Sequence, residues 1–318
     1  MVGLHAIGDK MRRSLQLTRR QTFAALAGVG LAGLRLDSRS ALARDANARS
    51  KSDASIDAKT AKWLTLPPTP ALPSTSRRGT ANVNGTGIFY AQFGQGPPVL
   101  LFHGGLGNSN YWGRQVEYLA KNFSVIVMDT RGHGRSPVTS RAFSYGLFAE
   151  DAAALMDFLQ ISQAAIVGWS DGAVTGLRLA MMRPEKVSKL LAFGANISAD
   201  GLKANGGRSS VFGAYVQRCK AEYAQLSPHP ERWSQLLDGL RIMWRSEPNF
   251  TKRNLSAAKA PTVVADGEYD EIIKAEHAAA IASAMPRARP LILPGVSHFA
   301  MLQDPDQFNR ALTAFLTA

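Results

Sequence analysis

The run Gly-Trp-Ser-Asp-Gly at residues 168–172 constrains this 318-residue chain more than any other feature of its sequence. A short apolar stretch, 164–167, precedes it, and a stretch typical of a helix, 173–182, follows it. Gly-x-Ser-x-Gly between a strand and a helix is typical of a sharp turn that lifts a nucleophilic serine out of a sheet. Its glycines lack the Cβ that would meet the adjacent strand and helix. The pattern predicts that Ser170 is a nucleophile.

A serine hydroxyl is a poor nucleophile at neutral pH and needs a neighbouring base. Of the six histidines in the chain, His298 follows a predicted strand, 290–293, and precedes the last predicted helix, 306–316. Loops at the carboxyl ends of strands hold the active residues of open α/β sheets. We therefore predict that His298 is the base, and the alternative is an ordinary loop histidine.

The acid that orients this base is expected on the loop after another predicted strand, 261–265, because that loop lies between the serine and the histidine in the chain. Position alone does not choose among the four carboxylates of the loop, which are Asp266, Glu268, Asp270 and Glu271.

From about residue 79 the chain alternates predicted strands and helices, which is typical of a mainly parallel sheet covered on both faces. The alternation stops over about 199–256, where two helical stretches, 211–226 and 230–245, predict a helical cap. The predicted strands are 86–93, 99–102, 123–128, 164–167, 190–193, 261–265 and 290–293.

Three further runs resemble motifs of the α/β-hydrolase superfamily. Gly-Glu-Tyr-Asp at 267–270 looks like its G-x-x-D, and Phe-His-Gly-Gly at 102–105 resembles its oxyanion loop. Asp-Thr-Arg-Gly-His-Gly-Arg-Ser at 129–136 resembles its D-x-R-G-x-G-x-S turn. Serine, acid and histidine also follow one another in the chain order of that superfamily. These motifs together span the predicted catalytic domain, 79–318.

The resemblance implies an α/β-hydrolase fold, with a mostly parallel eight-stranded sheet, helices on both faces and a short helical cap. It implies that Asp270 orients His298 and that the backbone N–H groups of Gly105 and Asp171 form the oxyanion hole. It also implies an enzyme without a cofactor or a metal. Serine at position 170 excludes the haloalkane dehalogenase and epoxide hydrolase branches, which carry aspartate there.

Four residues are candidates for substrate binding. Trp169 and Asp171 flank the predicted nucleophile, and the run 168–172 is similar to that of valacyclovirase-like α-amino-acid ester hydrolases. That resemblance implies that Asp171 meets a substrate ammonium, and the alternative is that it only complements the dipole of its helix. Tyr215 and Trp244 in the cap are candidates for an apolar pocket, although their helical spacing is equally typical of a cap core.

The N-terminal 80 residues have a different composition from the rest. They contain 14 Lys/Arg and 5 Asp/Glu, against 23 and 19 in the remainder, so most of the net charge of +13 lies there. The pair Arg19-Arg20 before an apolar stretch, 24–34, resembles a Tat export signal. We predict a signal peptide over 1–43, a flexible linker or arm over 44–78, and a periplasmic or secreted protein. The apolar stretch is shorter than the roughly 20 residues of a membrane span, so none is expected after cleavage.

These patterns predict an exported hydrolase that cleaves small carboxylic esters through Ser170, His298 and Asp270 and an acyl-enzyme intermediate. The alternatives within the fold are an amide, lactone or C–C bond hydrolase and a small aminopeptidase. The alternative from another class is a non-catalytic binding protein. No basic–aromatic patch predicts nucleic-acid binding, and the single cysteine, Cys219, allows no internal disulfide. The patterns do not indicate an oligomeric state.

Overall fold

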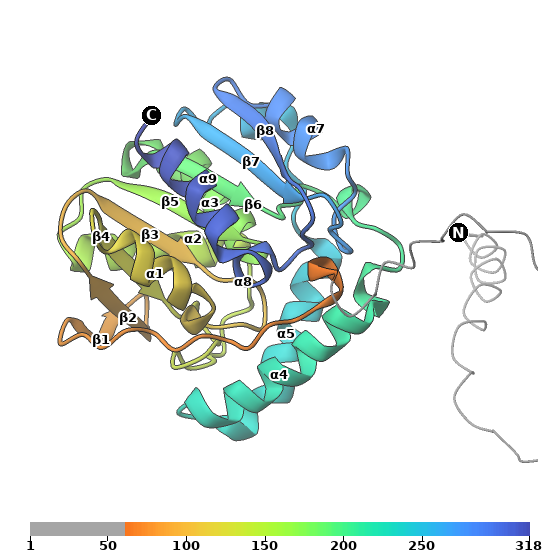
Figure 1. Ribbon diagram of the computed structural model, residues 1–318. Coiled ribbons are helices and arrows are strands. Elements are labelled where there is room, and N and C mark those ends of the chain that lie inside the picture. The colour runs from red at the N-terminus through yellow and green to blue at the C-terminus, as the bar shows by residue number, and fades with distance from the viewer. Residues whose placement is uncertain (1–60) are drawn as a thin grey trace, which may run out of the picture. The chain divides into compact units, whose positions relative to one another are not determined.

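Eight strands form one sheet in the computed structural model, which describes residues 61–318 (Figure 1). Their order is β1-β2-β4-β3-β5-β6-β7-β8; β2 is antiparallel to both its neighbours, and the other pairs are parallel. The predicted mostly parallel eight-stranded sheet is therefore confirmed. The strands are β1 (Arg78–Val83), β2 (Thr86–Phe93), β3 (Pro98–Phe102), β4 (Ser124–Met128), β5 (Ala164–Trp169), β6 (Val187–Phe193), β7 (Thr262–Gly267) and β8 (Ala288–Leu293).

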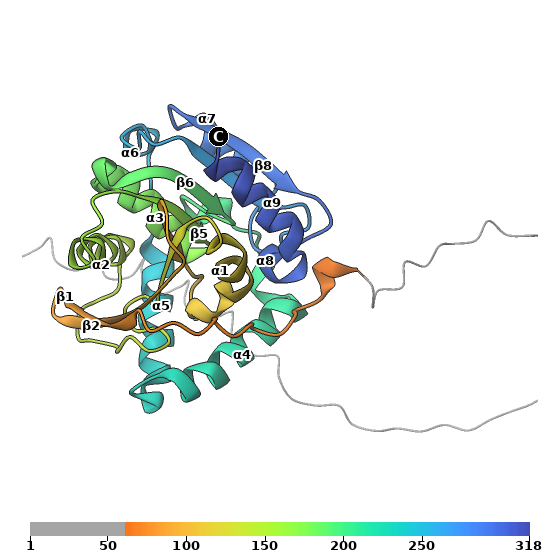
Figure 2. The same cartoon turned by 60° about the vertical axis from the view of Figure 1, so that its left-hand side comes forward.

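Alternate residues of the central strands face two separate cores, as the two-residue period of a strand requires. Leu101 of β3 belongs to the core that includes side chains of α1 and α9, whereas Leu100 belongs to the core of α2, α3 and α7. Helices thus cover both faces of the sheet (Figure 2). These helices and the short α8 are α1 (Gly113–Leu119), α2 (Tyr145–Phe158), α3 (Asp171–Met182), α7 (His277–Ser283), α8 (Ala300–Gln303) and α9 (Pro305–Leu316).

The segment between β6 and β7 is helical, and its two long helices lie below the central strands in Figure 1 and diverge from a common end in Figure 2. They are α4 (Ser210–Leu226) and α5 (Trp233–Ser246), followed by the short α6 (Lys252–Leu255). Cys219 is buried in α4, 3.6 Å from the Tyr111 hydroxyl, and burial raises the pKa of its thiol to about 12. A thiol that stays protonated at neutral pH is no nucleophile, so Cys219 is a packing residue.

Residues 61–77, which belong to the predicted arm, run along the domain (orange in Figure 1). The Trp63 ring stacks on Tyr269 with 4.1 Å between the centroids, and Arg218 of α4 donates two hydrogen bonds to arm carbonyls. The arm is therefore anchored to a loop and to the cap, which its proline-rich composition did not predict. The predicted signal peptide, 1–43, and the arm up to residue 60 lie outside the described residues.

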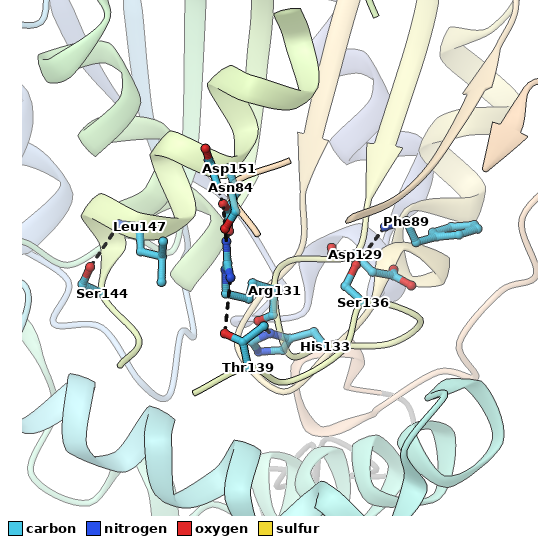
Figure 3. Close-up of polar contacts among 10 residues, drawn as sticks. All are labelled: Asn84, Phe89, Asp129, Arg131, His133, Ser136, Thr139, Ser144, Leu147 and Asp151. Atoms are coloured by element: carbon cyan, nitrogen blue, oxygen red, sulfur yellow. Dashed lines mark hydrogen bonds and ion pairs between the residues drawn. The ribbon is translucent and has the colours of Figure 1, made fainter. Parts of the chain in front are cut away.

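The turn after β4, at residues 129–136, is fixed by a buried ion pair (Figure 3). The Arg131 guanidinium donates from Nε and Nη2 to the two oxygens of Asp151 at 2.7 Å each, and both side chains are fully buried. Asn84 donates to Asp151 and accepts from Arg131. Removing one partner of such a pair typically destabilises a fold by about 3–5 kcal/mol, because it leaves a buried charge unpaired.

The same turn also holds the loop that follows β3. Asp129 Oδ1 accepts the Ser109 N–H at 2.7 Å, and its Oδ2 accepts the Arg135 N–H at 2.8 Å. The Ser136 hydroxyl donates to the Asp129 carbonyl at 2.6 Å. The loop after β3, which carries the predicted oxyanion donor, is therefore tied to the ordered end of β4.

Within residues 61–318, no helix is both long and apolar enough to cross a bilayer. The same part of the chain holds no group of three or more His, Cys, Asp or Glu side chains placed to bind a metal ion.

Candidate active site

Ser170 occupies the junction between β5 and α3, with φ 55° and ψ −122°. This left-handed conformation is strained for a residue with a side chain and persists only where its surroundings enforce it. A Cβ on Gly168 would lie 2.3 Å from the Gly172 carbonyl oxygen, and a Cβ on Gly172 would lie 2.2 Å from that of Phe102. Both glycines are thus required by the close approach of backbone, as the sequence motif predicted.

The structure brings His298 and Asp270 together. His298 Nδ1 lies 2.6 Å from Asp270 Oδ2, and Asp270 Oδ1 accepts the N–H groups of Ile272 and Ile273 at 2.7 and 2.8 Å. Of the four carboxylates that the sequence left open, Asp270 alone contacts the imidazole. The others bind elsewhere: Glu268 accepts the Gly295 N–H, Glu271 accepts the His298 backbone N–H, and Asp266 accepts the Gly267 N–H.

The pair is electrostatically coupled. Burial alone would lower the pKa of His298, but the charge and hydrogen bond of Asp270 outweigh it and raise this pKa above 6.5. Burial opposes ionisation of Asp270 too, yet His298 and the other hydrogen bonds lower its pKa to about 2. Asp270 therefore stays a carboxylate, and it orients Nδ1–H of the ring toward itself.

The other imidazole nitrogen, His298 Nε2, is buried and has no hydrogen-bond partner among the described residues. His298 and Ser170 line the same cavity, and the imidazole packs against Gly194, where a Cβ would lie 2.8 Å from its Cε1. A nitrogen left free in this position is suited to accept a proton from a group in the cavity.

The sequence predicts two backbone N–H groups as donors to an oxyanion. They belong to Gly105, in the loop after β3, and to Asp171, at the first position of α3. Within residues 61–318, neither N–H donates to a protein acceptor. The first N–H groups of a helix have no partner inside it and are available to an anion.

The Asp171 carboxyl group lies beside this pair of donors. Its Oδ1 accepts the Tyr145 hydroxyl at 2.7 Å, and its Oδ2 accepts the Trp244 indole N–H at 2.8 Å. Burial raises the pKa of Asp171, although both hydrogen bonds favour the charged form. A Cβ on Gly105 would lie 2.3 Å from Asp171 Oδ2, so the carboxyl group packs directly on that glycine.

The polar atoms of Trp169 and Tyr215 bind backbone rather than the cavity. The Trp169 indole N–H donates to the His298 carbonyl at 2.8 Å, and the Tyr215 hydroxyl donates to the Gly105 carbonyl at 2.6 Å. Both side chains are almost fully buried, although each contributes surface to the cavity. They therefore fix the base and the oxyanion loop, a role that was not predicted for them.

The cavity has a volume of about 250 Å³. Tyr145 and Glu247 line it and were not predicted, because Tyr145 begins α2 and Glu247 directly follows α5, and no motif marks either position. Its wall combines apolar side chains with two carboxylates and one lysine. The other lining residues are Gly105, Trp169, Ser170, Asp171, Asn196, Leu202, Lys203, Gly206, Gly207, Phe212, Tyr215, Trp244, Ile272, Ile273 and His298.

Two histidines of the sequence motifs have structural roles. His103 Nδ1 binds the Gly104 carbonyl at 2.8 Å, and its Nε2 accepts the Thr130 N–H at 3.0 Å. Burial lowers the pKa of His103, and it lowers that of His133 to about 3. Both rings therefore stay neutral, and His103 links the oxyanion loop to the turn after β4.

Comparison with known proteins places the chain in a family. Residues 97–205 match the sequence profile of the alpha/beta hydrolase fold. The chain is 30% identical over 248 residues to the serine hydrolase BPHL of Mus musculus. The aligned region covers 74% of this chain and 84% of that protein. The chain therefore belongs to the α/β-hydrolase family, and it is an enzyme of that family.

Solved structures show the same fold. Est816, an N-acyl homoserine lactone degrading enzyme, matches with a TM-score of 0.64 and 25% identity. The match covers 74% of this chain and 100% of the Est816 chain. The enol-lactonase from Burkholderia xenovorans LB400 has a TM-score of 0.61 and 23% identity, and covers 76% of this chain and 100% of its own.

The hydrogen bond from Tyr215 to the Gly105 carbonyl predicts a defect in turnover. We expect Tyr215→Phe to lower kcat by roughly fivefold with little change in KM, because a lost hydrogen bond is worth about 1 kcal/mol and the Gly105 N–H is predicted to bind the oxyanion of the transition state. Steady-state kinetics on a p-nitrophenyl ester measures this. Tyr118→Phe, which alters an exposed tyrosine of α1, is the matched control. An unchanged kcat in Tyr215→Phe would show that the bond does not position the loop.

Proposed function

We propose that this enzyme is a serine hydrolase that cleaves carboxylic esters through Ser170, His298 and Asp270. The observation that carries the proposal is the state of His298. One ring nitrogen is bound to Asp270 at 2.6 Å, and the other is buried, unpartnered and part of the cavity wall that includes Ser170. The likeness to a serine hydrolase and to an enzyme that degrades N-acyl homoserine lactones supports acyl–oxygen cleavage.

The reaction follows from these positions. Ser170 Oγ attacks the ester carbonyl carbon while its proton passes to His298 Nε2, and the carbonyl π electrons move to oxygen. The oxyanion accepts hydrogen bonds from the N–H groups of Gly105 and Asp171; one such donor is typically worth about 3 kcal/mol. When the tetrahedral intermediate collapses, the acyl–oxygen bond breaks and His298 protonates the leaving alkoxide. Water, deprotonated by His298, then attacks the acyl-enzyme. When the Ser170 Oγ–acyl bond breaks, His298 returns the proton to Ser170 Oγ and the acid is released.

A positively charged substrate group is favoured by the cavity wall. Asp171 and Glu247 both line the cavity, and the Asp171 carboxyl group packs on Gly105, one of the two proposed oxyanion donors. An ammonium on the carbon next to the ester carbonyl would therefore lie beside Asp171 when the carbonyl oxygen occupies the oxyanion hole. We propose α-amino-acid esters as the preferred subset of esters.

Export through the Tat pathway is proposed on sequence grounds, from Arg19-Arg20 and the apolar stretch that follows. We expect the full chain with both arginines replaced by lysine to accumulate in the cytoplasm of a Tat-competent bacterium. The wild-type chain should be found in the periplasm or the medium. Cell fractionation with N-terminal sequencing measures both outcomes, and equal export of the two chains would exclude the pathway.

Replacing Ser170 by alanine tests the nucleophile. We expect turnover of p-nitrophenyl acetate and butyrate to fall by at least about 10³-fold, with a melting temperature close to that of the wild type, because alanine keeps the Cβ and removes only the hydroxyl. A fluorophosphonate probe should label the wild type at Ser170 and leave Ser170→Ala unlabelled. Undiminished hydrolysis by the variant would exclude the mechanism, and absent labelling of the wild type would favour a binding protein.

Replacing Asp171 by asparagine tests the substrate class. The amide keeps the size of the carboxyl group and can still accept from Trp244. Its NH₂ group can donate to the Tyr145 oxygen, so the charge is lost and the contact with Tyr145 is kept with its direction reversed. We expect the ratio of kcat/KM for an aminoacyl ester to that for its deamino analogue to fall about tenfold. Activity on the deamino ester should stay within a few-fold of wild type. An unchanged ratio would show that Asp171 serves the helix and not the substrate.

A further inference from the structure

Gln303 is a buried side chain that contacts the loop of the proposed base. It is the last residue of α8, five residues after His298, and is 7% exposed. Its Oε1 accepts the Ser297 N–H at 2.7 Å, and its Nε2 donates to the Ser297 hydroxyl at 3.0 Å. Two hydrogen bonds from one side chain thus fix the residue that directly precedes His298.

The third hydrogen bond of this amide reaches the arm. Gln303 Nε2 also donates to the Thr65 carbonyl at 2.9 Å. The Ser297 N–H can only donate and the Thr65 carbonyl can only accept. A primary amide has an acceptor oxygen and two donor hydrogens, so one glutamine side chain satisfies both backbone groups. The amide therefore joins the base loop to a segment that lies 238 residues from Gln303 along the chain.

The arm is anchored on both sides of Thr65. Before it, Lys62 forms an ion pair with Asp304, with 2.6 Å between Nζ and Oδ2. After it, Arg218 of α4 donates to the carbonyls of the next two residues, at 2.7 and 2.5 Å. The Thr65 carbonyl therefore has a fixed position from which it accepts the Gln303 amide.

The base loop depends on this support because its backbone is buried. Ser297 is 1% exposed, and its carbonyl packs so closely on Gly267 that a Cβ there would lie 2.5 Å from the oxygen. Without the amide of Gln303 the Ser297 N–H would have no acceptor in its present position. A buried donor without a partner is costly, so the loop would shift to reach one. His298, the next residue, would shift with it.

We propose that Gln303 is a positioning residue that holds the imidazole of His298 against Asp270, and that the arm completes this support through the Thr65 carbonyl. The inference rests on the proposed function, because it assigns Gln303 and the arm to the support of the triad. Gln303 is not among the residues that line the cavity, so it acts on the imidazole through Ser297 and not on the substrate. The arm is then a working part of the active site.

Replacing Gln303 by methionine removes the three hydrogen bonds and keeps a side chain of similar length. We expect kcat for a p-nitrophenyl ester to fall roughly 10- to 100-fold, because a small misplacement of a catalytic group has an effect of this size. KM should stay within about twofold of wild type, because the substrate contacts are kept. Gln163→Met, at an exposed glutamine that donates to the Glu185 carbonyl, is the matched control and should leave both unchanged.

Proton NMR tests the position of the imidazole without any turnover. The Nδ1–H of His298, which lies 2.6 Å from Asp270 Oδ2, should give a resonance far downfield of the other protons, and its loss in Asp270→Asn assigns it. We expect this resonance to shift or broaden in Gln303→Met and to be unchanged in Gln163→Met. The readout stays valid if Ser170→Ala retains activity, so failure of the proposed function and failure of the Gln303 assignment are distinguishable.

Replacing Arg218 by methionine loosens the arm without a change in the base loop. We expect kcat to fall roughly fivefold, as for a lost hydrogen bond, and the downfield resonance to shift. Adding Arg218→Met to Gln303→Met should change kcat by no more than about twofold, because both substitutions weaken the same support. Lys220→Met, which removes the same charge from an exposed position of α4, is the control and should leave kcat unchanged.

Three results would overturn the proposal. Wild-type kcat in folded Gln303→Met would mean that the amide positions nothing. An unchanged downfield resonance in that variant would mean that the imidazole has not moved. Additive losses in the double variant would mean that the arm does not act through Gln303. Thermal melting checks folding; if Gln303→Met does not fold, Arg218→Met decides, and an unchanged kcat and resonance there would overturn the proposal.

Discussion

The left-handed backbone at Ser170 is the constraint on which the rest of the site depends. It requires β5 and α3 to meet so closely that the Phe102 carbonyl leaves no room for a Cβ on Gly172. Phe102 is also the last residue of β3, and the loop that carries Gly105 follows it directly. One close contact therefore fixes the proposed nucleophile and the two proposed oxyanion donors relative to each other. A site built on packed backbone in this way loses little free energy to reorganisation during the reaction.

Local sequence patterns were sufficient wherever a function depends on a few consecutive residues. The apolar runs of the central strands, the glycines around Ser170 and the loop position of His298 could all be read directly from the chain. The edge strand β1 was missed because its sequence, Arg-Gly-Thr-Ala-Asn-Val, is mostly polar and only one of its side chains is buried. Strand β1 is defined by its antiparallel pairing with β2, and a pattern of apolar residues does not reveal such a pairing.

The roles of Trp169 and Tyr215 could not be read from the sequence for a different reason. Each donates one hydrogen bond to a carbonyl more than a hundred residues away along the chain, at His298 and Gly105. Trp169 was predicted to bind substrate because it flanks Ser170, and Tyr215 because it is an aromatic residue of the cap; both do contribute surface to the cavity. Only the tertiary structure shows that their polar atoms are already used, which leaves their rings as apolar wall. The choice of Asp270 also required the tertiary structure. Of the four neighbouring carboxylates, it is the one whose oxygen lies 2.6 Å from His298 Nδ1.

The negative charges around His298 control how readily this proposed base accepts a proton. Burial lowers the pKa of His298, but the charges of Asp270, Glu271 and Asp171 each raise it and together outweigh burial. A neutral ester does not change that balance when it binds. An ammonium beside Asp171 offsets one of the three charges, lowers the pKa of the imidazole and frees the base for Ser170. Under the proposed preference for α-amino-acid esters, the substrate charge would thus serve catalysis as well as binding.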